Sequence, residues 1–143
     1  MRFVDLEPGD ARLQADALPV LTELRPHLTP ELLGAIYAEG FPQGLRFTTV
    51  YDEQDDCVAV AGWRLVATTV AVRKLYVDDL LTVPARRSSG VGGALLQELE
   101  RRAREAGCRA IDLDSAVTRS DAHRFYLRER MAITSFHFAR VLS

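Results

Sequence analysis

The chain has 143 residues, of which 48% are hydrophobic and 27% charged, and its formal net charge is −2 at pH 7. We expect one domain, residues 1–143, because a chain of this length can bury roughly two thirds of its unfolded surface. Basic residues are dispersed beyond the pair Arg86-Arg87. The sequence therefore predicts no surface suited to nucleic acid or to an anionic membrane.

Composition and spacing also bear on location and on metals. Apolar stretches are far shorter than a bilayer span, and residues 1–5 lack the charged-then-apolar order of a signal peptide. Cys57 and Cys108 are isolated cysteines, as expected in a reducing compartment, so we expect a cytoplasmic protein. The three histidines have no metal-ligand spacing between them, and no metal site is predicted.

The first third of the chain predicts a strand followed by two helices. Residues 3–6 are expected to form the strand and residues 11–24 a helical region. A second helix is expected up to Glu39, because Thr29 suits the N-cap position and Pro30 the first turn.

β-branched and aromatic residues then predict three strands, at residues 45–51, 58–69 and 72–83. An amphipathic helix begins within the glycines that follow and ends at Gly107, where a left-handed cap residue is favoured. Residues 110–114 predict another strand, and a further helix begins at about Ser120. Residues 133–142 predict a closing strand or hairpin.

This order of elements predicts the fold class. Antiparallel strands followed by a strand-helix-strand unit indicate an α/β fold of the mixed α+β kind. Its central sheet should be mixed and mostly antiparallel, with helices on both faces.

The sequence Arg87-Ser88-Ser89-Gly90-Val91-Gly92-Gly93-Ala94 connects the third predicted strand to the amphipathic helix. We call the part from Arg87 to Gly93 the cradle. With so little side chain at its glycines, a phosphate can approach backbone N–H groups that the first helical turn leaves unpaired. Arg86 and Arg87 can add charge-assisted donors. The cradle therefore predicts a pyrophosphate site, and a flexible turn without a ligand is the alternative.

Two other phosphate-binding patterns were compared with the cradle. A P-loop needs Lys and then Ser or Thr after its last glycine, where this chain has Ala94 and Leu95. A dinucleotide fingerprint needs a small residue at the position of Leu95. Asp112 and Asp114 nevertheless follow at the distance expected of a ribose-binding acid, so the dinucleotide alternative stays open.

The spacing Arg87-x-x-Gly90-x-Gly92 resembles the acyl-CoA signature of the GNAT superfamily of N-acetyltransferases. The segment Ala122-His123-Arg124-Phe125-Tyr126 resembles the Ala-x-x-Phe-Tyr core of the helix that carries the family's usual tyrosine. The resemblance covers residues 75–143 well, and the first half only in its order of elements. It implies a GNAT-like fold with a splayed pair of parallel strands. It also implies an enzyme that moves the acetyl group of acetyl-CoA directly to a primary amine.

The resemblance also implies which residues bind acetyl-CoA. No metal is expected in the reaction. The backbone of Leu80, Leu81 and Thr82 would pair with the pantetheine arm as if it were another strand. Around the phosphates, the cofactor-binding residues would be Arg87, Ser88, Ser89, Gly90, Val91, Gly92 and Gly93. Arg119 stands where the family commonly has Asn and could contact the cofactor as a cation. Arg130-Met131 replaces the family's Gly-Phe after the tyrosine helix.

For catalysis, the resemblance implies that Tyr126 protonates the departing thiolate, since a phenol with a pKa near 10 is protonated at neutral pH. Packing in the core is the alternative role for this tyrosine. A carboxylate must also remove a proton from the incoming ammonium, and Asp114 is the first candidate. Asp79 and Asp78 are the second candidates, and strand alternation predicts that they point to opposite faces. A solvated or ion-paired carboxylate is the alternative for each of the three.

The acceptor stays open between small-molecule and peptide amines, and the slight acidity of the protein favours a cationic one. An exposed edge strand such as residues 133–142 would allow a homodimer. A second hypothesis is a non-catalytic acyl-CoA-binding sensor or interaction module of the same fold, which the departures at Arg119 and Arg130-Met131 favour.

Overall fold

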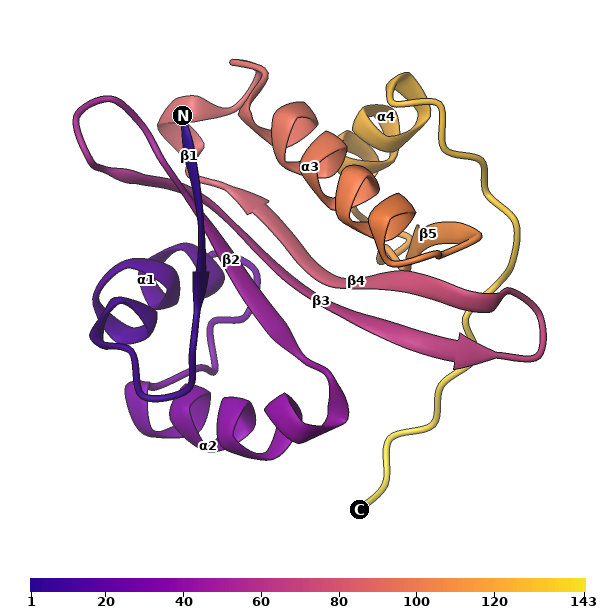
Figure 1. The fold of residues 1–143 in the computed structure, drawn as a ribbon, viewed down its shortest axis with the longest axis horizontal. Helices are drawn as coiled ribbons and strands as arrows, with labels where there is room; N and C mark the ends of the chain where they lie inside the picture. The colour runs from indigo at the N-terminus through magenta and orange to yellow at the C-terminus, as the bar shows by residue number, and fades with distance from the viewer. The chain divides into compact units, whose positions relative to one another are not determined.

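Antiparallel strands make up most of a five-stranded sheet. In the computed structural model, which describes residues Met1–Ser143, the strands are β1 (Arg2–Leu6), β2 (Arg46–Tyr51), β3 (Cys57–Thr68), β4 (Val72–Thr82) and β5 (Ala110–Leu113). Their spatial order is β1-β2-β3-β4-β5, with β1 to β4 antiparallel and β5 parallel to β4 (Figure 1). The mixed, mostly antiparallel sheet confirms the predicted fold class.

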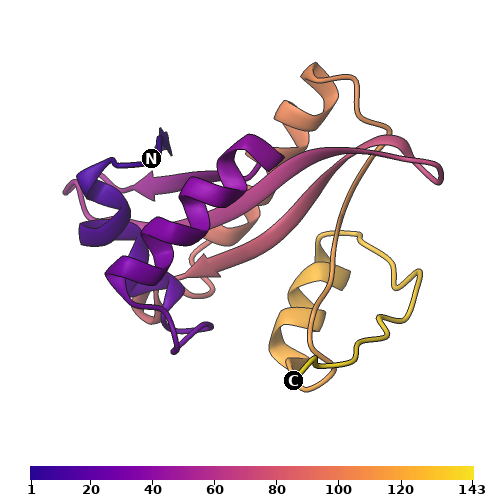
Figure 2. The same cartoon turned by 90° about the horizontal axis from the view of Figure 1, so that it is seen from below.

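Helices lie on both faces of this sheet (Figures 1 and 2). A π-helical segment (Leu13–Ala17) leads into α1 (Leu18–Leu21), and α1 and α2 (Pro30–Gly40) cover one face. α3 (Val91–Glu105) packs against β3 and β4 on the opposite face. α1 itself ends at Leu21, and the rest of the predicted helical region up to residue 24 forms hydrogen-bonded turns, with the Leu24 amide donating to the Leu21 carbonyl at 3.1 Å.

Thr29 caps α2 as its sequence predicts. The Thr29 side chain accepts a hydrogen bond from the Leu32 amide at 3.1 Å, and Pro30 is the first helical residue. This bond satisfies one of the N–H groups that the start of a helix leaves unpaired. The cap fixes where α2 begins and therefore where the connection from α1 must end.

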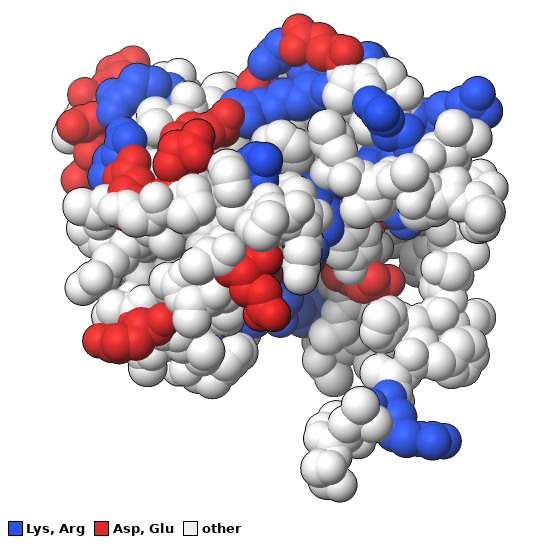
Figure 3. All heavy atoms as spheres, turned by 60° about the horizontal axis from the view of Figure 1, so that its bottom comes forward, with Lys and Arg blue, Asp and Glu red and all other residues white.

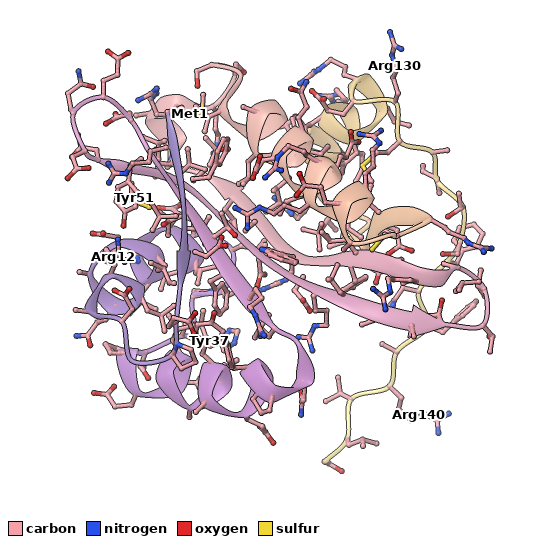
Figure 4. All side chains as sticks on the ribbon, viewed as in Figure 1. Met1, Arg12, Tyr37, Tyr51, Arg130 and Arg140 are labelled. Atoms are coloured by element: carbon pink, nitrogen blue, oxygen red, sulfur yellow. The ribbon has the colours of Figure 1, made fainter.

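The larger part of the core lies between the sheet and the pair α1 and α2. Tyr37 of α2 is fully buried there and points toward the strands (Figure 4). Its hydroxyl donates to the Leu6 carbonyl at 2.5 Å and accepts from the Phe47 amide at 3.3 Å. Burial raises the pKa of the Tyr37 phenol. The remaining buried side chains of this cluster are Leu6, Leu13, Ala17, Leu18, Val20, Leu21, Leu33, Leu45, Phe47, Val60 and Leu81.

α3 packs on the sheet through an apolar stripe. Its buried residues are Val91, Leu95, Leu96, Leu99 and Ala103, which follow the predicted helical spacing. Gly107 adopts φ +75 and ends the helix, with the Cys108 amide donating to the Ala103 carbonyl at 2.8 Å. A helix docked in this way holds its N-terminus, and with it the cradle, in a fixed position on the sheet.

The chain divides into two compact units, Met1–Asp112 and Leu113–Ser143. The first contains the sheet and α1 to α3, and the second contains α4 (Ser120–Arg128). That the whole chain forms one domain therefore stays a prediction. None of the helices is both long and apolar enough to cross a membrane.

The prediction of a closing strand or hairpin at residues 133–142 is wrong. Residues 132–143 have no regular secondary structure, and the side chains of Ile133, Phe136 and Phe138 are exposed. Strand propensity reflects the fit of a side chain to a sheet surface, so a strand-like pattern forms no strand where the backbone finds no neighbour to pair with.

Candidate active site

The cradle forms a bend between β4 and α3. β4 ends at Thr82, a 3-10 turn (Pro84–Arg86) follows, and Ser88 and Gly90 then adopt φ +62 and +88. A Cβ added at Gly90 would meet nothing within 4 Å, so its positive φ and not crowding favours glycine. This left-handed backbone turns the chain sharply into the first turn of α3.

The amides at the start of α3 are free to bind a ligand. The first backbone bond that closes the helix runs from the Ala94 amide to the Gly90 carbonyl at 3.0 Å, and no side chain caps this end. The amides of residues 90–93 therefore have no hydrogen-bond partner in the chain, and the helix dipole adds positive potential beside them. This end of α3 fits a phosphate.

The two arginines before the cradle differ in their contacts. Arg86 donates to Asp52 at 2.8 Å, and this ion pair links the cradle to the β2–β3 turn. Hydrogen bonds from the Asp56 and Gln54 amides and from Arg86 lower the pKa of Asp52. Arg87 is exposed and forms no ion pair. Of the two donors predicted for a phosphate, Arg87 is available, whereas Arg86 is already bound.

The end of β4 offers an open backbone edge. Leu80, Leu81 and Thr82 pair with β3 on one side. On the other side, β5 starts beside the beginning of β4, where the Arg109 amide donates to the Arg73 carbonyl at 2.8 Å. β5 has four residues and β4 has eleven, so the last part of β4 extends beyond β5. An extended ligand can add to this edge.

A β-bulge in β4 changes the geometry of the candidate bases. Gly62 pairs with Asp79 and Trp63 with Val77, which leaves Asp78 as the extra residue. The carboxylate of Asp79 lies 3.2 Å from the position of a Cβ at Gly62, and Asp78 binds Arg64, two residues along β3. Both carboxylates therefore lie on the α1 and α2 face. The prediction that they point to opposite faces is wrong, because the bulge interrupts the alternation of β4.

Asp79 is the more buried of the two carboxylates. Its side chain is 16% exposed and accepts from Arg25, with Nε and Nη2 at 3.1 and 3.0 Å from Oδ1. Burial raises the pKa of Asp79, and the charge of Arg25 opposes this rise. A carboxylate whose pKa is raised toward neutrality becomes a better proton acceptor, which is the property required of a general base.

The second unit holds the other predicted catalytic residues. Tyr126 lies on α4 with its ring edge-to-face against Phe125, at 5.3 Å between centroids. Burial raises the pKa of Tyr126, so its phenol is protonated at neutral pH. Arg119 occupies the N-cap position of α4, and its charge opposes this rise in the pKa of Tyr126. Asp114 follows the end of β5, and its Oδ2 lies 3.7 Å from Nδ1 of His137.

The structure thus groups the predicted residues within each unit. The cradle, residues 80–82 and Asp79 belong to the first unit, and Tyr126, Asp114 and Arg119 belong to the second. Sequence reasoning missed Arg25 and Arg64 as partners of Asp79 and Asp78. The signal was the presence of two adjacent acids inside a strand, which requires cationic partners or a bulge.

Acidic and basic side chains are mixed on the surface, and many of them are paired. On the face shown in Figure 3, acidic and basic side chains lie next to one another and do not form separate fields. Residues 1–143 contain no group of three or more His, Cys, Asp or Glu side chains that could hold a metal ion. Lys74 forms an ion pair with Asp112 at 2.8 Å, so one of the two candidates for a ribose-binding acid already has a partner.

The first unit thus combines an open β4 edge with a glycine-rich bend that leads to the N-terminus of α3. The family model described as "Acetyltransferase (GNAT) family" matches residues 12–131. The chain belongs to this family, and it is an enzyme of the N-acetyltransferase class.

Two curated relatives are named as N-acetyltransferases. The uncharacterized N-acetyltransferase YhdJ of Bacillus subtilis is 31% identical over 124 residues, which cover 84% of each chain. The aminoalkylphosphonate N-acetyltransferase of Salmonella typhimurium is 38% identical over 66 residues, which cover 46% of this chain and 43% of that protein. This chain therefore aligns with less than half the length of the Salmonella protein.

Solved structures share the fold at lower identity. The aminoglycoside N-acetyltransferase AAC(6')-Iy in complex with CoA superposes with a TM-score of 0.84 at 14% identity, covering 98% of this chain and 93% of that one. A Trypanosoma brucei acetyltransferase superposes with a TM-score of 0.78 at 20% identity, covering 99% of each chain. These likenesses support the same architecture.

Proposed function

We propose that the protein transfers the acetyl group of acetyl-CoA directly to a primary amine. The observation that carries this proposal is the set of unpartnered amides at residues 90–93, beside the open edge of β4. Relatives named for amine-containing acceptors and a similar structure solved with CoA support it. A cytoplasmic location is part of the same proposal.

In this proposal, the first unit binds the donor substrate. The segment from Ser88 to Gly93 holds the phosphates, through the free amides of residues 90–93 and the exposed Arg87. The backbone at Leu80 to Thr82 takes up the extended pantetheine arm, and an N–H group near Leu81 polarises the thioester carbonyl. These contacts place the acetyl group at the bulge, close to Asp79.

The chemistry needs three proton transfers. The acceptor enters as an ammonium and gives one proton to a carboxylate, Asp79 or Asp114, so that a neutral amine attacks the carbonyl. A carbon–nitrogen bond forms, the carbon–sulfur bond breaks, and Tyr126 protonates the departing thiolate. The second proton on nitrogen then returns to the tyrosine through solvent. Asp79 is the stronger candidate base because burial raises its pKa.

The non-catalytic sensor hypothesis depended on Arg119 and Arg130-Met131. Arg119 occupies the N-cap position of α4, where its carbonyl accepts from the His123 amide at 3.1 Å, and Arg130 adopts the left-handed conformation that the family's glycine would take. Both positions therefore keep a defined role at the ends of α4. The membership of the chain in an enzyme family leaves direct transfer as the proposed function.

Substitution of the cradle tests the proposal. Gly92→Val should weaken CoA binding at least tenfold, measured by isothermal titration calorimetry, because a branched side chain blocks the approach of a phosphate to the backbone. Gly34→Val is the matched control, since a Cβ at Gly34 in α2 meets nothing within 4 Å. Equal CoA affinity in the two variants would remove the cradle from the binding site.

A further inference from the structure

Four charged side chains form a cluster on the α1 and α2 face of the sheet, which we call the bulge cluster: Arg25, Arg64, Asp78 and Asp79. Arg25 lies in the connection after α1, where its amide donates to the Leu21 carbonyl at 2.9 Å. Arg64 comes from β3, and the two acids come from the bulge in β4. The charges of Asp78 and Arg64 both act on Asp79, so the four groups form one electrostatic unit.

The hydrogen bonds inside the cluster leave a specific set of groups unused. Asp78 accepts on both oxygens from Arg64, with Nε at 3.0 Å and Nη2 at 3.2 Å. Arg25 directs Nε and Nη2 at Oδ1 of Asp79. The Nη1 groups of both arginines, and Oδ2 of Asp79, have no hydrogen-bond partner. Two cationic donors and one carboxylate oxygen are therefore available to a ligand.

This set does not suit a cationic acceptor. The carboxylates are already neutralised by the arginines, and a second cation would meet two guanidinium groups. An acceptor that carries both an ammonium and an anion can match all the unused groups at once. The anion would bind to the guanidinium donors, which suit carboxylate, sulfonate and phosphonate oxygens.

We propose that the acceptor is a small primary amine that also carries an anionic group, with Arg25 and Arg64 binding the anion and Asp79 receiving the ammonium. This inference rests on the proposed function and replaces the cationic acceptor favoured by net charge. Arg25 is 43% exposed, so its guanidinium can turn from Asp79 toward the ligand, which frees the carboxylate to accept a proton.

A panel of two-carbon amines tests the inference. Thiol release from acetyl-CoA is measured with 2-aminoethylphosphonate, β-alanine, ethanolamine and ethylenediamine. We expect kcat/KM to be at least tenfold higher for the two anionic amines than for neutral ethanolamine, and lowest for the cationic diamine. Equal or reversed preference would overturn the inference while leaving the transferase function intact. Absence of acceptor-dependent release with every amine would overturn both.

Variants of the cluster make the assignment specific. Arg64→Gln should lower kcat/KM for 2-aminoethylphosphonate at least tenfold more than for ethanolamine, mainly through KM, and Arg64→Lys should restore part of this selectivity. Arg12→Gln is the control, because Arg12 pairs with Asp10 on an exposed surface elsewhere. Proportional loss with both amines in Arg64→Gln, in a variant that still binds CoA and melts like the wild type, would contradict anion binding by Arg64.

Discussion

Arg130 adopts a backbone conformation that usually belongs to glycine. It follows α4 at φ +67, with its amide donating to the Leu127 carbonyl at 3.1 Å and the Met131 amide donating to the Tyr126 carbonyl at 3.0 Å. These are the bonds of the helix end that a left-handed glycine normally allows. The chain therefore keeps the turn that the family builds with glycine, at the expense of strain in an L-residue.

Replacement of this arginine by glycine should stabilise the protein. Arg130→Gly removes the left-handed strain and should raise the free energy of unfolding by about 1 kcal/mol, measured by urea denaturation. Arg124→Gly is the control and should lower it by about 1 kcal/mol, because Arg124 lies in the middle of α4. A loss of stability in Arg130→Gly would show that the arginine side chain contributes more than the turn costs.

The phenol of Tyr126 is the proposed proton donor to the departing thiolate. Tyr126→Phe should lower kcat by roughly 10²- to 10⁴-fold and leave CoA affinity near that of the wild type, because only the proton donor is lost. Tyr51→Phe is the matched control, because it also removes a phenol hydroxyl. The Tyr51 hydroxyl donates to Asp16 at 2.5 Å and lies outside the proposed site. Undiminished turnover in Tyr126→Phe would remove this residue from the mechanism.

At the scale of single elements, α3 depends on ion pairs as well as on its apolar stripe. Glu98 accepts from Arg101 at 2.7 and 2.9 Å and from Arg102 at 2.9 Å. These bonds, first those from Arg101, lower the pKa of Glu98 to about 2, against the opposing effect of burial. Glu98 thereby organises two arginines on the helix that carries the cradle.

The depressed pKa of Glu98 predicts a dependence of stability on pH. A carboxylate whose pKa is lower in the folded state contributes stability above its unfolded value of 4.5, and this stability is lost as the pH falls toward about 2. Glu98→Gln should therefore be less stable than the wild type at pH 7, and the difference should shrink between pH 4.5 and 2. Urea unfolding at pH 7, 5 and 3 measures it.

Glu100→Gln provides the comparison, because Glu100 lies 3.9 Å from Arg104 in a looser pair. Its difference from the wild type should be small at every pH. A pH-independent loss in Glu98→Gln would indicate lost packing and not a lost charge.

At the scale of the whole first unit, a polar network joins the sheet to α3. Thr48 is fully buried on β2, and its hydroxyl accepts from Nε1 of Trp63 at 2.9 Å and donates to Asp5 at 2.7 Å. Arg102 reaches from α3 to the same two residues, at 3.2 Å from Thr48 and 2.6 Å from Asp5. The network thus connects β1, β2, β3 and α3 through one hydroxyl.

Removal of this hydroxyl should destabilise the unit as a whole. Thr48→Val leaves the buried Trp63 N–H without an acceptor and should lower the free energy of unfolding by about 1–3 kcal/mol. Trp63 is the single tryptophan of the chain, so its fluorescence during urea unfolding reports the change directly. The exposed Thr69→Val is the control, and equal stability of both variants would show that the network contributes nothing.

Local signals in the sequence determined the five strands of the sheet, the start of α2 and the position of the cradle between β4 and α3. Thr29-Pro30 predicted the N-cap because the capping bond forms within one turn. The cradle likewise depends on glycines next to the residues they serve. Each of these features is set by neighbours in sequence, and the family signature lies within such segments.

The tertiary structure decided the features that depend on partners far along the chain. The bulge at Asp78 arises from pairing with β3, and it alone places both acids with Arg25 and Arg64. Residues 133–142 have the composition of a strand but no neighbour to pair with. Alternation specifies a face only while a ladder is regular, and a strand exists only when another backbone satisfies its hydrogen bonds.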